Sequence, residues 1–190
     1  MINPISLVKS YYEKAKELNL KYFDAAVLCT SRDNIPDGRN VLIKEITENG
    51  FIFYTNYNSK KGKDLELNPH ACIVFYWQDL GIQIRIRGKV EKVENQKSIE
   101  YFRTRPKGSQ ISAYISKQSE ELESYEKLVE IFEEYSKTFK DREVEKPEDW
   151  GGYILIPSEI EIWEEKPYRL HKRVLYYLDG NIWKMKYLYP

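Results

Sequence analysis

The chain has few of the residues from which metal sites and disulfide frameworks are built. Only 2 Cys and 2 His occur among its 190 residues. Cys29 and Cys72 lie in apolar, strand-like runs, which predicts buried free thiols in a reducing cytoplasm. His70 and His171 are far apart in the sequence, and neither has a neighbouring Cys or second His. Because a zinc or iron site needs several ligands close together, we expect no protein-ligated metal.

An excess of charge of one sign is also missing. The 30 Lys and Arg residues balance the 30 Asp and Glu residues, so no overall positive field attracts nucleic acid or anionic lipid. No apolar run approaches the roughly 20 residues of a membrane-spanning helix. The N-terminus lacks the basic start and apolar middle of a signal peptide. We expect a cytoplasmic protein that binds neither membranes nor nucleic acid.

Two common nucleotide-binding patterns are absent as well. The sequence contains no Gly-x-Gly-x-x-Gly after a strand and no Gly-Lys-Ser/Thr loop, which argues against Rossmann-type and Walker-type sites. What is abundant is apolar and aromatic side chains, at 42% and 14% of the chain, too many for a disordered protein. The length fits one domain, so we expect residues 1–190 to form a single domain.

Hydrophobic spacing predicts a few helices among many strands. Asn3 is expected to cap a first helix that begins at Pro4, and Pro106 is expected to end a later one. The further helical segments are residues 59–67, 95–105 and about 119–140. The expected strands are residues 25–29, 41–46, 51–55, 71–77, 82–93, 150–156, 159–163, 169–178 and 181–188.

The connections between these strands favour an antiparallel sheet. Glu48-Asn49-Gly50 predicts a type I′ hairpin turn, and Asp179-Gly180 predicts a second hairpin. Because most connections are of this kind, we expect a mainly β, α+β fold, in which an antiparallel barrel-like sheet is decorated with helices, and not a doubly wound sheet.

Positive charge is concentrated at a predicted helix start. Ser59 precedes Lys60 and Lys61, which would lie in the first turn of the helix. A helix N-terminus already carries partial positive charge, so lysines there are unfavourable unless a phosphate or carboxylate joins them. Either they help to bind an anion or they are solvated surface lysines. Arg39 and Lys44, which flank a strand, add two further cations.

Two rows of cationic residues show the spacing of strands. Arg169, His171 and Arg173 alternate with period two, so they are expected on one face of a strand. That face is either a charged edge strand or the wall of an anion site. Gln83, Arg85 and Arg87 form a similar row, for which we favour a surface face.

A third group has helical spacing. Tyr101, Arg105 and Ser109 are four residues apart, and despite Pro106 they are candidates for converging on one small anion. Gln118 and Ser119 are expected to open the acidic helix, with Ser119 as a simple N-cap or, less favoured, an anion ligand. From these residues alone we predict a protein with two or more phosphate-sized cationic pockets.

The same residues belong to motifs that, in their order, resemble the pyridoxamine 5′-phosphate oxidase family. The resemblance extends from about Asn3 to Pro190. The motifs are Arg39-Asn-Val-Leu-Ile-Lys44, Phe53-Tyr-Thr-Asn56, Ser59-Lys-Lys61, Tyr101-Phe-Arg-Thr-Arg-Pro106, Ser109-Gln-Ile111, Ser116-Lys-Gln-Ser119, Trp150-Gly-Gly-Tyr153, Ile160-Glu-Ile-Trp163, Arg169-Leu-His-Lys-Arg173 and the ending Trp183-Lys-Met-Lys-Tyr-Leu-Tyr-Pro190.

This resemblance implies an FMN-binding split barrel that forms a homodimer with FMN at the interface. It also implies FMN-dependent oxidation of pyridoxamine 5′-phosphate and pyridoxine 5′-phosphate by O2. The products would be pyridoxal 5′-phosphate and H2O2, with ammonia from the amine, as in vitamin B6 biosynthesis and salvage. The segment of about 150–190 would provide the hairpin for dimerisation and substrate binding.

The resemblance also assigns roles to individual residues. Arg169 and His171 would be catalytic and would lie over the substrate ring. The substrate would be bound by Lys44, Tyr101, Arg105, Ser109, Arg169 and His171. FMN would be bound by Arg39, Val41, Leu42, Tyr54, Thr55, Ser59, Lys60, Lys61, Gln83, Gln118, Ser119, Trp163 and Arg173.

Three features depart from the family pattern. Lys60 stands where the family usually has Arg, Lys172 stands where it usually has Asp, and the chain begins at the first helix, without the N-terminal extension of many relatives. Two alternative functions remain open. One is a related split-barrel flavin oxidase of another substrate, such as those of phenazine biosynthesis. The other is a non-catalytic module that binds flavin or pyridoxal phosphate.

Overall fold

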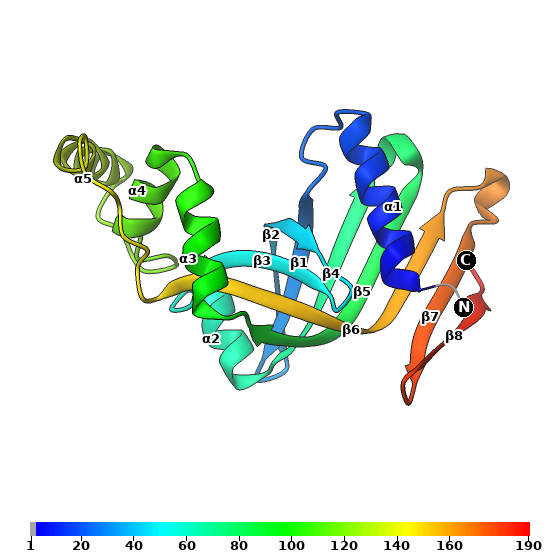
Figure 1. The fold of residues 1–190 in the computed structure, drawn as a ribbon. Helices are drawn as coiled ribbons and strands as arrows, with labels where there is room; N and C mark the ends of the chain where they lie inside the picture. Colours follow the sequence, from blue (N-terminus) through cyan, green and yellow to red (C-terminus); the bar gives the residue numbers. More distant parts are fainter. Residues whose placement is uncertain (1–2) are drawn as a thin grey trace.

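The computed structural model describes residues 3–190 and contains eight strands in one antiparallel sheet (Figure 1). The strands alternate buried and exposed side chains, as expected of a sheet with one face on a core. The elements are α1 (Pro4–Glu17), β1 (Ala25–Arg32), β2 (Ile35–Ile46), β3 (Phe51–Asn56), α2 (Lys60–Leu67), β4 (His70–Trp77), η1 (Gln78–Leu80), β5 (Ile82–Lys92), α3 (Asn95–Thr104), α4 (Lys107–Ile115), α5 (Tyr125–Thr138), β6 (Trp150–Glu164), η2 (Pro167–Arg169), β7 (Lys172–Asp179) and β8 (Ile182–Leu188).

Six of the strands close into a barrel. Their order is β3-β2-β1-β4-β5-β6, and an additional pairing of β3 with β6 closes the ring. The long strand β6 has two partners along one of its edges. Residues 150–155 pair with β3, and the part from Glu159 onward pairs with β7. The β7–β8 hairpin therefore extends the sheet outside the barrel. The antiparallel barrel-like sheet predicted from the sequence is confirmed.

Strand β6 corrects one expected boundary. The sequence predicted separate strands at residues 150–156 and 159–163, because Pro157 and Ser158 interrupt the apolar pattern. The structure has one strand of 15 residues, and β5 pairs with it on both sides of an irregularity between Arg87 and Gly88. A bulge of this kind absorbs the interruption without ending the strand.

The barrel interior is the main hydrophobic core, and α1 packs against it (Figure 1). Phe53, Ile84 and Leu155 are completely buried there. Helix α1 adds Val8 and Ala15, also completely buried, and the Tyr12 hydroxyl donates to the Ile43 carbonyl at 2.9 Å. As predicted, Asn3 caps this helix, since its side chain accepts a hydrogen bond from the Ile5 N–H at 3.0 Å. The helix therefore has one apolar face on the sheet.

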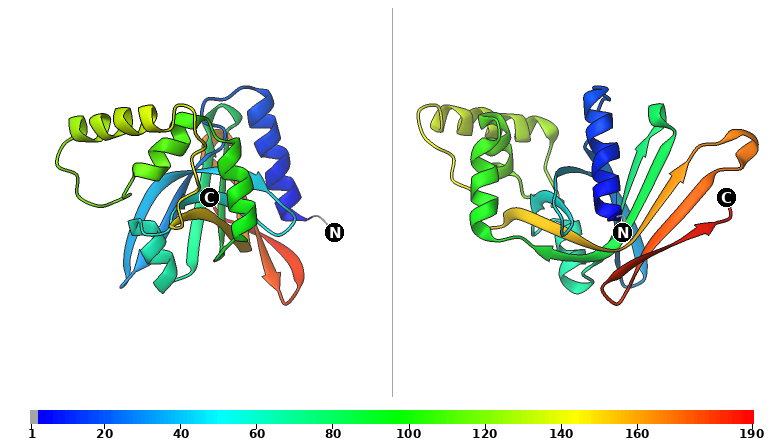
Figure 2. Two further views of the ribbon diagram at one scale, coloured as in Figure 1. Left: turned by 60° about the vertical axis from the view of Figure 1, so that its left-hand side comes forward. Right: turned by 45° about the vertical axis from the view of Figure 1, so that its right-hand side comes forward.

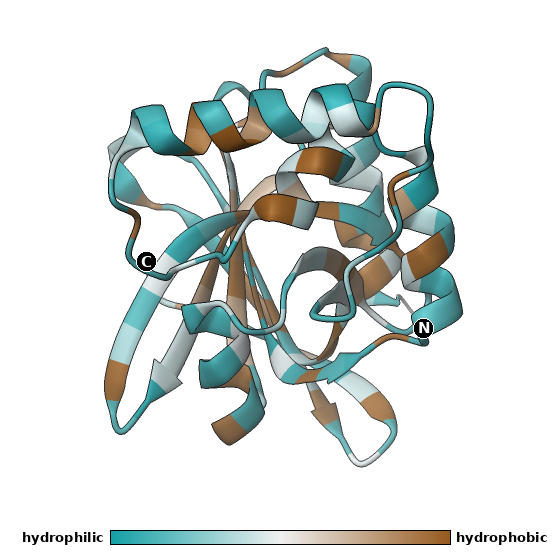
Figure 3. Ribbon diagram, turned by 90° about the vertical axis from the view of Figure 1, so that its left-hand side faces the viewer, coloured by the Kyte–Doolittle hydropathy of each residue, from teal (hydrophilic) through white to brown (hydrophobic). Residues whose placement is uncertain are grey.

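A second, smaller core joins α3 and α4 to the start of β6. It consists of Phe102, Ile111, Val144 and Trp150. The right-hand view in Figure 2 shows α3, α4 and α5 grouped together, away from the β7–β8 hairpin. Helix α5 has no fully buried residue, and Figure 3 shows hydrophobic bands along it between hydrophilic ones.

Two helical expectations were wrong in this region. The acidic helix begins at Tyr125 and not near residue 119, and Ser124 is its N-cap, accepting from the Lys127 N–H at 3.1 Å. Ser119 instead has a φ of 74°. Helix α4 was not predicted at all, because Gly108 and Ser109 after Pro106 are weak helix formers. Its Ile111 is 3% exposed in the second core, so tertiary packing supports this helix.

The hairpin turns also differ from expectation in detail. A turn between β2 and β3 is confirmed, but it is not of type I′, because Asn49 does not have positive φ and Gly50 is nearly extended at 159°. Instead, the Thr47 hydroxyl accepts from the N–H groups of both residues. The hairpin between β1 and β2 was missed, although Asp33 and Asn34 adopt φ values of 52° and 63°. Asp and Asn tolerate this region better than most residues.

The two thiols are free and lie opposite each other in the register of β1 and β4. Cys29 and Cys72 are half-buried, and not fully buried as the sequence predicted. They point to the sheet face away from the core, where Val27 is 38% exposed and Tyr76 is 59% exposed. No helix in the described part of the chain is both long and apolar enough to cross a membrane.

Candidate functional site

A cavity of about 580 Å³ lies between the barrel and the α3–α4 unit. Strands β2 and β3, the start of α2 and both helices contribute to its wall. Most of the predicted flavin-binding and substrate-binding residues of the first 118 positions meet here. The lining residues are Asn40, Val41, Leu42, Lys44, Tyr54, Thr55, Asn56, Lys61, Tyr101, Thr104, Arg105, Pro106, Ser109, Ser112, Ala113, Ser116, Gln118 and Trp150.

Lys61 brings a buried positive charge to this cavity. It is 7% exposed, and its Nζ bonds to the Thr55 hydroxyl at 3.2 Å, the Ser59 hydroxyl at 3.2 Å and Gln118 Oε1 at 3.0 Å. All three acceptors are neutral, and no carboxylate of residues 3–190 forms an ion pair with it. Burial, reinforced by the nearby charge of Arg39, lowers the pKa of Lys61 to about 8. A buried ammonium without a counterion favours binding of an anion.

Ser59 places Lys61 at the start of α2. Its buried hydroxyl caps the helix by accepting from the Gly62 N–H at 3.3 Å, and it donates to the Asn56 carbonyl at 2.7 Å. The helix starts so close to the preceding loop that a Cβ on Gly62 would lie 1.9 Å from the Tyr57 carbonyl oxygen. Glycine is therefore required at the third residue of this helix, which is Gly62.

Arg39 lies behind this helix start, in a network with two carboxylates. Its Nη1 donates to the Thr30 hydroxyl at 2.7 Å, and its Nη2 lies 2.6 Å from Asp37 Oδ2 and 3.7 Å from the buried Asp64. The Nη2 contact with Asp37 lacks the geometry of a hydrogen bond, so this buried nitrogen has no acceptor among the described residues. The Arg39 Nη2 is thus ion-paired with Asp37 but makes no hydrogen bond.

Lys60 is placed differently from Lys61. It is exposed, and its Nζ lies 2.6 Å from Asp37 and 3.6 Å from Asp64. The hydrogen bond from Lys60, together with Arg39, lowers the pKa of Asp37 to about 2. Carboxylates of the chain thus compensate the unfavourable charge of Lys60 at the helix start. The charge of Lys61 has no such partner among the described residues. Lys60 and Ser59 do not line the cavity themselves.

Aromatic rings form the opposite part of the wall. Tyr54 and Tyr101 stack with ring centroids 3.9 Å apart, and Trp150 stacks on Tyr54 at 5.6 Å. The Arg105 guanidinium lies over the Trp150 ring at 4.8 Å, a cation–π arrangement. Its Nη1 is buried and has no hydrogen-bond partner in the described structure, and burial lowers the pKa of Arg105. Arg105 therefore offers an unused guanidinium donor at the cavity.

The structure brings Tyr101, Arg105 and Ser109 to one place, as their spacing predicted. All three line the cavity, although the chain changes from α3 to α4 between them. Lys44 lines it as well, with its Nζ 2.6 Å from Asp24. Sequence reasoning missed Ser112, one turn after Ser109 on the unpredicted helix α4. The helical i, i+3 spacing is the signal that would have found it.

Three other predicted residues lie in one row on a different part of the sheet. Gln83 of β5 pairs with Trp163 of β6, and Trp163 pairs with Arg173 of β7. This flavin row, as we call these three residues, spans the outer sheet face, and none of its members lines the cavity. In Figure 1, helices α3 and α4 lie on the left of the barrel and strand β7 lies on its right. The described chain therefore does not bring all the predicted flavin ligands together.

Arg169 and His171 precede β7, which corrects their expected placement on a strand. Arg169 and the preceding Tyr168 both have left-handed backbones, with φ values of 60° and 58°. Two such residues in succession, neither of them glycine, are strained, and strain of this kind is often found at functional sites. Arg169 is exposed. His171 packs on the Trp163 ring at 4.5 Å, and its Nδ1 accepts from the Lys166 N–H at 3.2 Å.

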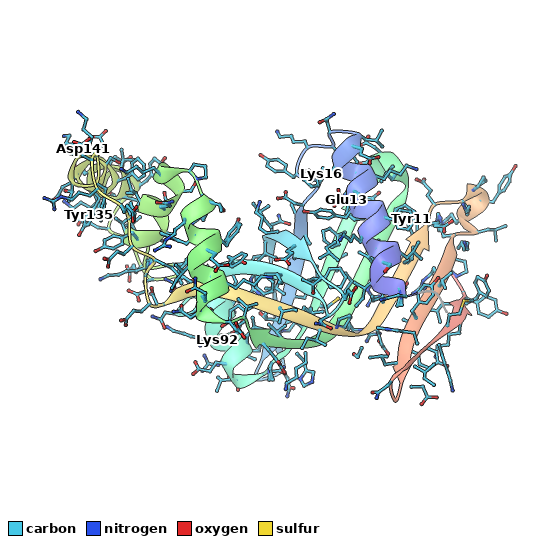
Figure 4. The ribbon with its side chains drawn as sticks, in the orientation of Figure 1. Tyr11, Glu13, Lys16, Lys92, Tyr135 and Asp141 are labelled. Carbon is cyan, nitrogen blue, oxygen red and sulfur yellow. The ribbon has the colours of Figure 1, made fainter. Side chains whose placement is uncertain are left out.

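Lys172, the departure from the family pattern, has a carboxylate partner within the chain. Its Nζ lies 3.1 Å from Glu164 Oε1. Tyr11 lies on the side of α1 that faces β7 (Figure 4). Burial is the main cause of the raised pKa of Tyr11, and the negative charge of Glu164 raises it further. Because Lys172 pairs with Glu164, the additional positive charge of Lys172 is balanced locally.

Ser119, a predicted cofactor ligand, lies outside the cavity although the adjacent Gln118 lines it. It is exposed and does not line the cavity, whereas the adjacent Gln118 does and accepts from the Thr55 hydroxyl at 2.9 Å. The positive φ of Ser119 turns the chain away after Gln118. The cavity as a whole presents one unused guanidinium nitrogen of Arg105 and the Lys61 ammonium beside stacked aromatic rings, which suits planar ligands that carry phosphate groups.

The fold belongs to a known class. Over its whole length the chain superimposes on an FMN-binding protein from Nostoc punctiforme related to pyridoxamine 5′-phosphate oxidase, with a TM-score of 0.76, 17% identity and 100% coverage of both chains. The protein is thus a split barrel of the FMN-binding type. Residues 12–139 match the family described as pyridoxamine 5′-phosphate oxidase, and residues 150–190 match the pyridoxine 5′-phosphate oxidase C-terminal dimerisation region. The chain belongs to the pyridoxamine 5′-phosphate oxidase family.

Individual relatives agree with this assignment. The chain is 42% identical over 190 residues to the pyridoxine/pyridoxamine 5′-phosphate oxidase of Nostoc sp., with 99% of this chain and 89% of the relative covered. A protein of the same name from Hydrogenovibrio crunogenus is 39% identical, with the same coverage. PhzG from Burkholderia lata, solved in complex with tetrahydrophenazine-1-carboxylic acid, has a TM-score of 0.93 and 30% identity, covering 98% of this chain and 92% of PhzG.

Proposed function

We propose that the protein is an FMN-dependent oxidase that makes pyridoxal 5′-phosphate. Pyridoxine 5′-phosphate and O2 would give pyridoxal 5′-phosphate and H2O2, and the amine would in addition consume water and release ammonia. The observation that carries the proposal is a pair of cationic groups at one cavity that have no carboxylate partner among the described residues. These groups are the Lys61 ammonium and Arg105 Nη1. Both the cofactor and the substrate carry a phosphate.

The FMN phosphate is assigned to the start of α2. Lys61 offers an ammonium without a carboxylate partner there, Arg39 lies behind it, and the N-terminus of the helix adds its own partial positive charge. Ser59 and Lys60 support this end of the site, since one orients Lys61 and the other holds Asp37. The remaining ligands are proposed to surround the ribityl chain and ring, namely Val41, Leu42, Tyr54, Thr55, Gln118, Ser119 and the flavin row.

The substrate phosphate is assigned to the α3–α4 junction. Lys44, Tyr101, Arg105 and Ser109 would bind it, with the unpaired Arg105 Nη1 as the strongest donor. Arg169 and His171 would lie over the substrate ring. The strained turn presents Arg169 to solvent, where it is able to close on a bound ligand. His171 would be held against Trp163 by its bond from the Lys166 N–H.

When bound, FMN supplies the acceptor for the hydride of the substrate and is reoxidised by O2. The residues of the chain bind both phosphates and align the donor carbon with the flavin. Alignment of this kind lowers the activation barrier by several kcal/mol. In the best-oriented intramolecular reactions the reduction reaches about 7–11 kcal/mol. No side chain of the site needs to act as a nucleophile in this scheme.

A homodimer would complete the site. Because the cavity and the flavin row lie on different parts of the chain, a second copy is proposed to bring its Gln83, Trp163 and Arg173 to the flavin of the first. The similarity of residues 150–190 to a dimerisation region supports this arrangement. We further propose that residues 1–190 act as a single domain in the cytoplasm.

Anaerobic reduction tests the proposed activity. The FMN-loaded protein is mixed with pyridoxine 5′-phosphate without oxygen while the flavin absorbance is followed, and oxygen is then admitted. Bleaching, recovery and formation of pyridoxal 5′-phosphate are expected. A flavin that both phosphorylated substrates leave oxidised would refute the oxidase and favour a non-catalytic binding module.

Mixed dimers test the shared site. Lys61→Met disables the cavity and Arg173→Ala disables the flavin row, so each homodimer is expected to be nearly inactive. Random mixing gives heterodimers with one intact site, and about one quarter of wild-type activity should return. If no activity returns on mixing while both variants dimerise, the two halves of the site belong to one chain.

A second candidate function is oxidation of a reduced phenazine. The likeness to PhzG over nearly the whole chain supports it. The Arg105 pocket argues against it, because a carboxylated phenazine offers no phosphate to Lys44, Arg105 and Ser109. Turnover of tetrahydrophenazine-1-carboxylic acid, compared with pyridoxine 5′-phosphate under the same conditions, decides between them.

A further inference from the structure

We propose that Glu161 is a positioning residue, which holds the Arg173 guanidinium in the orientation that meets the flavin. This inference rests on the proposed function, because it takes Arg173 as a flavin ligand. Glu161 lies on β6, two residues before Trp163 and on the same outer face of the sheet. It is 6% exposed, which is unusual for a carboxylate.

The contacts of Arg173 show how its side chain is fixed. Its Nε and Nη2 both lie 2.8 Å from Glu161 Oε1. Its Nη1 donates to the Tyr189 carbonyl, also at 2.8 Å. All three guanidinium nitrogens are therefore engaged, and the plane of the group is determined by one carboxylate and one backbone carbonyl. The remaining N–H groups of the Arg173 guanidinium, which these contacts do not use, therefore point in a defined direction.

The second oxygen of Glu161 has its own partner. Arg85 Nη1 donates to Glu161 Oε2 at 3.1 Å from the neighbouring strand β5. Glu161 thus separates two guanidinium groups that would otherwise repel each other on a half-buried face. Removing a carboxylate from such a group leaves uncompensated charge, which is more disruptive than removing an exposed ion pair. Arg173 would then be free to move away from its present orientation.

The same strand contains a matched pair for comparison. Glu159 is two residues earlier on β6 and pairs with Arg87 of β5. It is on the same face, but it is much less buried than Glu161, its partner Arg87 is exposed, and Arg87 is not among the residues predicted to bind FMN. Glu159→Gln therefore removes an equivalent charge from the same strand without affecting Arg173.

The experiment measures FMN affinity and the visible circular dichroism of bound FMN in the dimeric protein. Glu161→Gln is expected to raise the FMN dissociation constant about tenfold and to change the dichroism spectrum, whereas Glu159→Gln stays within about twofold of wild type. Glu161→Asp keeps the negative charge but shortens the side chain by one methylene, so an FMN dissociation constant between those of wild type and Glu161→Gln is expected. If Glu161→Gln does not fold, Glu161→Asp replaces it in the test.

A double-mutant cycle with Arg173→Ala separates positioning from general stability. If Glu161 acts through Arg173, Glu161→Gln has no further effect on FMN affinity in the Arg173→Ala background. An equal effect in both backgrounds, or wild-type affinity in Glu161→Gln, overturns the inference while leaving the proposed function intact. If Arg173→Ala itself binds FMN like wild type, the proposed flavin row is wrong and the inference falls with it.

Discussion

The cations of the cavity and those of the outer sheet face are arranged in opposite ways. At the cavity, Lys61 bonds only to neutral acceptors, and the buried Arg105 Nη1 has no hydrogen-bond partner in the described structure. On the sheet face, Arg85 and Arg173 share the carboxylate of Glu161. The exception within the cavity is Lys44, which pairs with Asp24.

This difference indicates which positive charges await a ligand. A chain with equal numbers of acidic and basic residues has enough carboxylates to pair every cation. Buried cations that nevertheless lack a carboxylate carry a desolvation cost, which an anionic ligand would remove. Paired cations such as Arg173 are instead oriented by the protein before any ligand arrives. This contrast is consistent with the proposed binding of phosphates at the cavity and the proposed alignment of the flavin at the sheet face.

The largest expected effect concerns the unpaired arginine of the substrate pocket. Arg105→Ala removes a charge-assisted donor to the substrate phosphate, and kcat/KM for pyridoxine 5′-phosphate should fall about 100-fold, mainly through KM. FMN content should remain that of wild type. Steady-state kinetics and the flavin absorbance of the purified protein measure both quantities.

Arg103→Ala is the matched control, since Arg103 is exposed on the same turn of α3 and does not line the cavity. It should change kcat/KM little. Loss of FMN from Arg105→Ala together with a normal KM would contradict the division into two phosphate pockets.

The next effect is a pH dependence of FMN binding. Burial lowers the pKa of Lys61 to about 8 in the flavin-free protein, so its positive charge is present below pH 8 and is lost as the pH rises above it. Above this pH, the FMN dissociation constant should increase about tenfold per pH unit. Fluorescence titration between pH 7 and pH 9.5 measures it.

Lys61→Met should bind FMN weakly and without this rise, whereas Lys63→Met, altered at an exposed residue of the same helix, should behave like wild type. A rise that persists in Lys61→Met would show that another group titrates.

A smaller effect is expected in the flavin row. Gln83→Ala removes one neutral hydrogen-bonding group, so the FMN dissociation constant should increase about fivefold, which corresponds to about 1 kcal/mol. The same fluorescence titration measures it, with the exposed Gln78→Ala as the control. Unchanged affinity in a dimeric Gln83→Ala protein would place the row away from the flavin.

The smallest effect concerns an exposed pair of the sheet face. Lys172 pairs with Glu164, but its side chain is 45% exposed, so Lys172→Ala should change the free energy of unfolding by less than about 1 kcal/mol. Denaturant titration measures this change. A much larger loss would mean that exposed paired cations also support the fold, and the contrast between the two regions would weaken.

The elements that were predicted correctly are those with a strong local pattern. Asn3 before Pro4 predicted the start of α1, and the alternating apolar residues predicted most strands. The errors occur where packing outweighs local preference. Helix α4 forms because Ile111 reaches the second core, and β6 continues past Pro157 because β5 pairs with it on both sides. Neither cause is visible in the local sequence.

The candidate site divides in the same manner. Tyr101, Arg105 and Ser109 were found from their spacing alone, and the structure brings them to one cavity. Arg169 and His171 were expected on a strand, but a left-handed turn precedes β7. Period-two spacing does not reveal such a turn, because Tyr168 and Arg169 are not residues that usually adopt it.

By itself, the sequence determined the strand-rich class, the free thiols and the identity of the cationic residues, because these follow from composition and short-range spacing. Only the tertiary structure decided which cations have carboxylate partners and which do not. Glu161 is 12 residues from Arg173 but 76 from Arg85, and Lys61 is 57 residues from Gln118. Pairing across such separations depends on strand register and barrel closure, which no local pattern encodes.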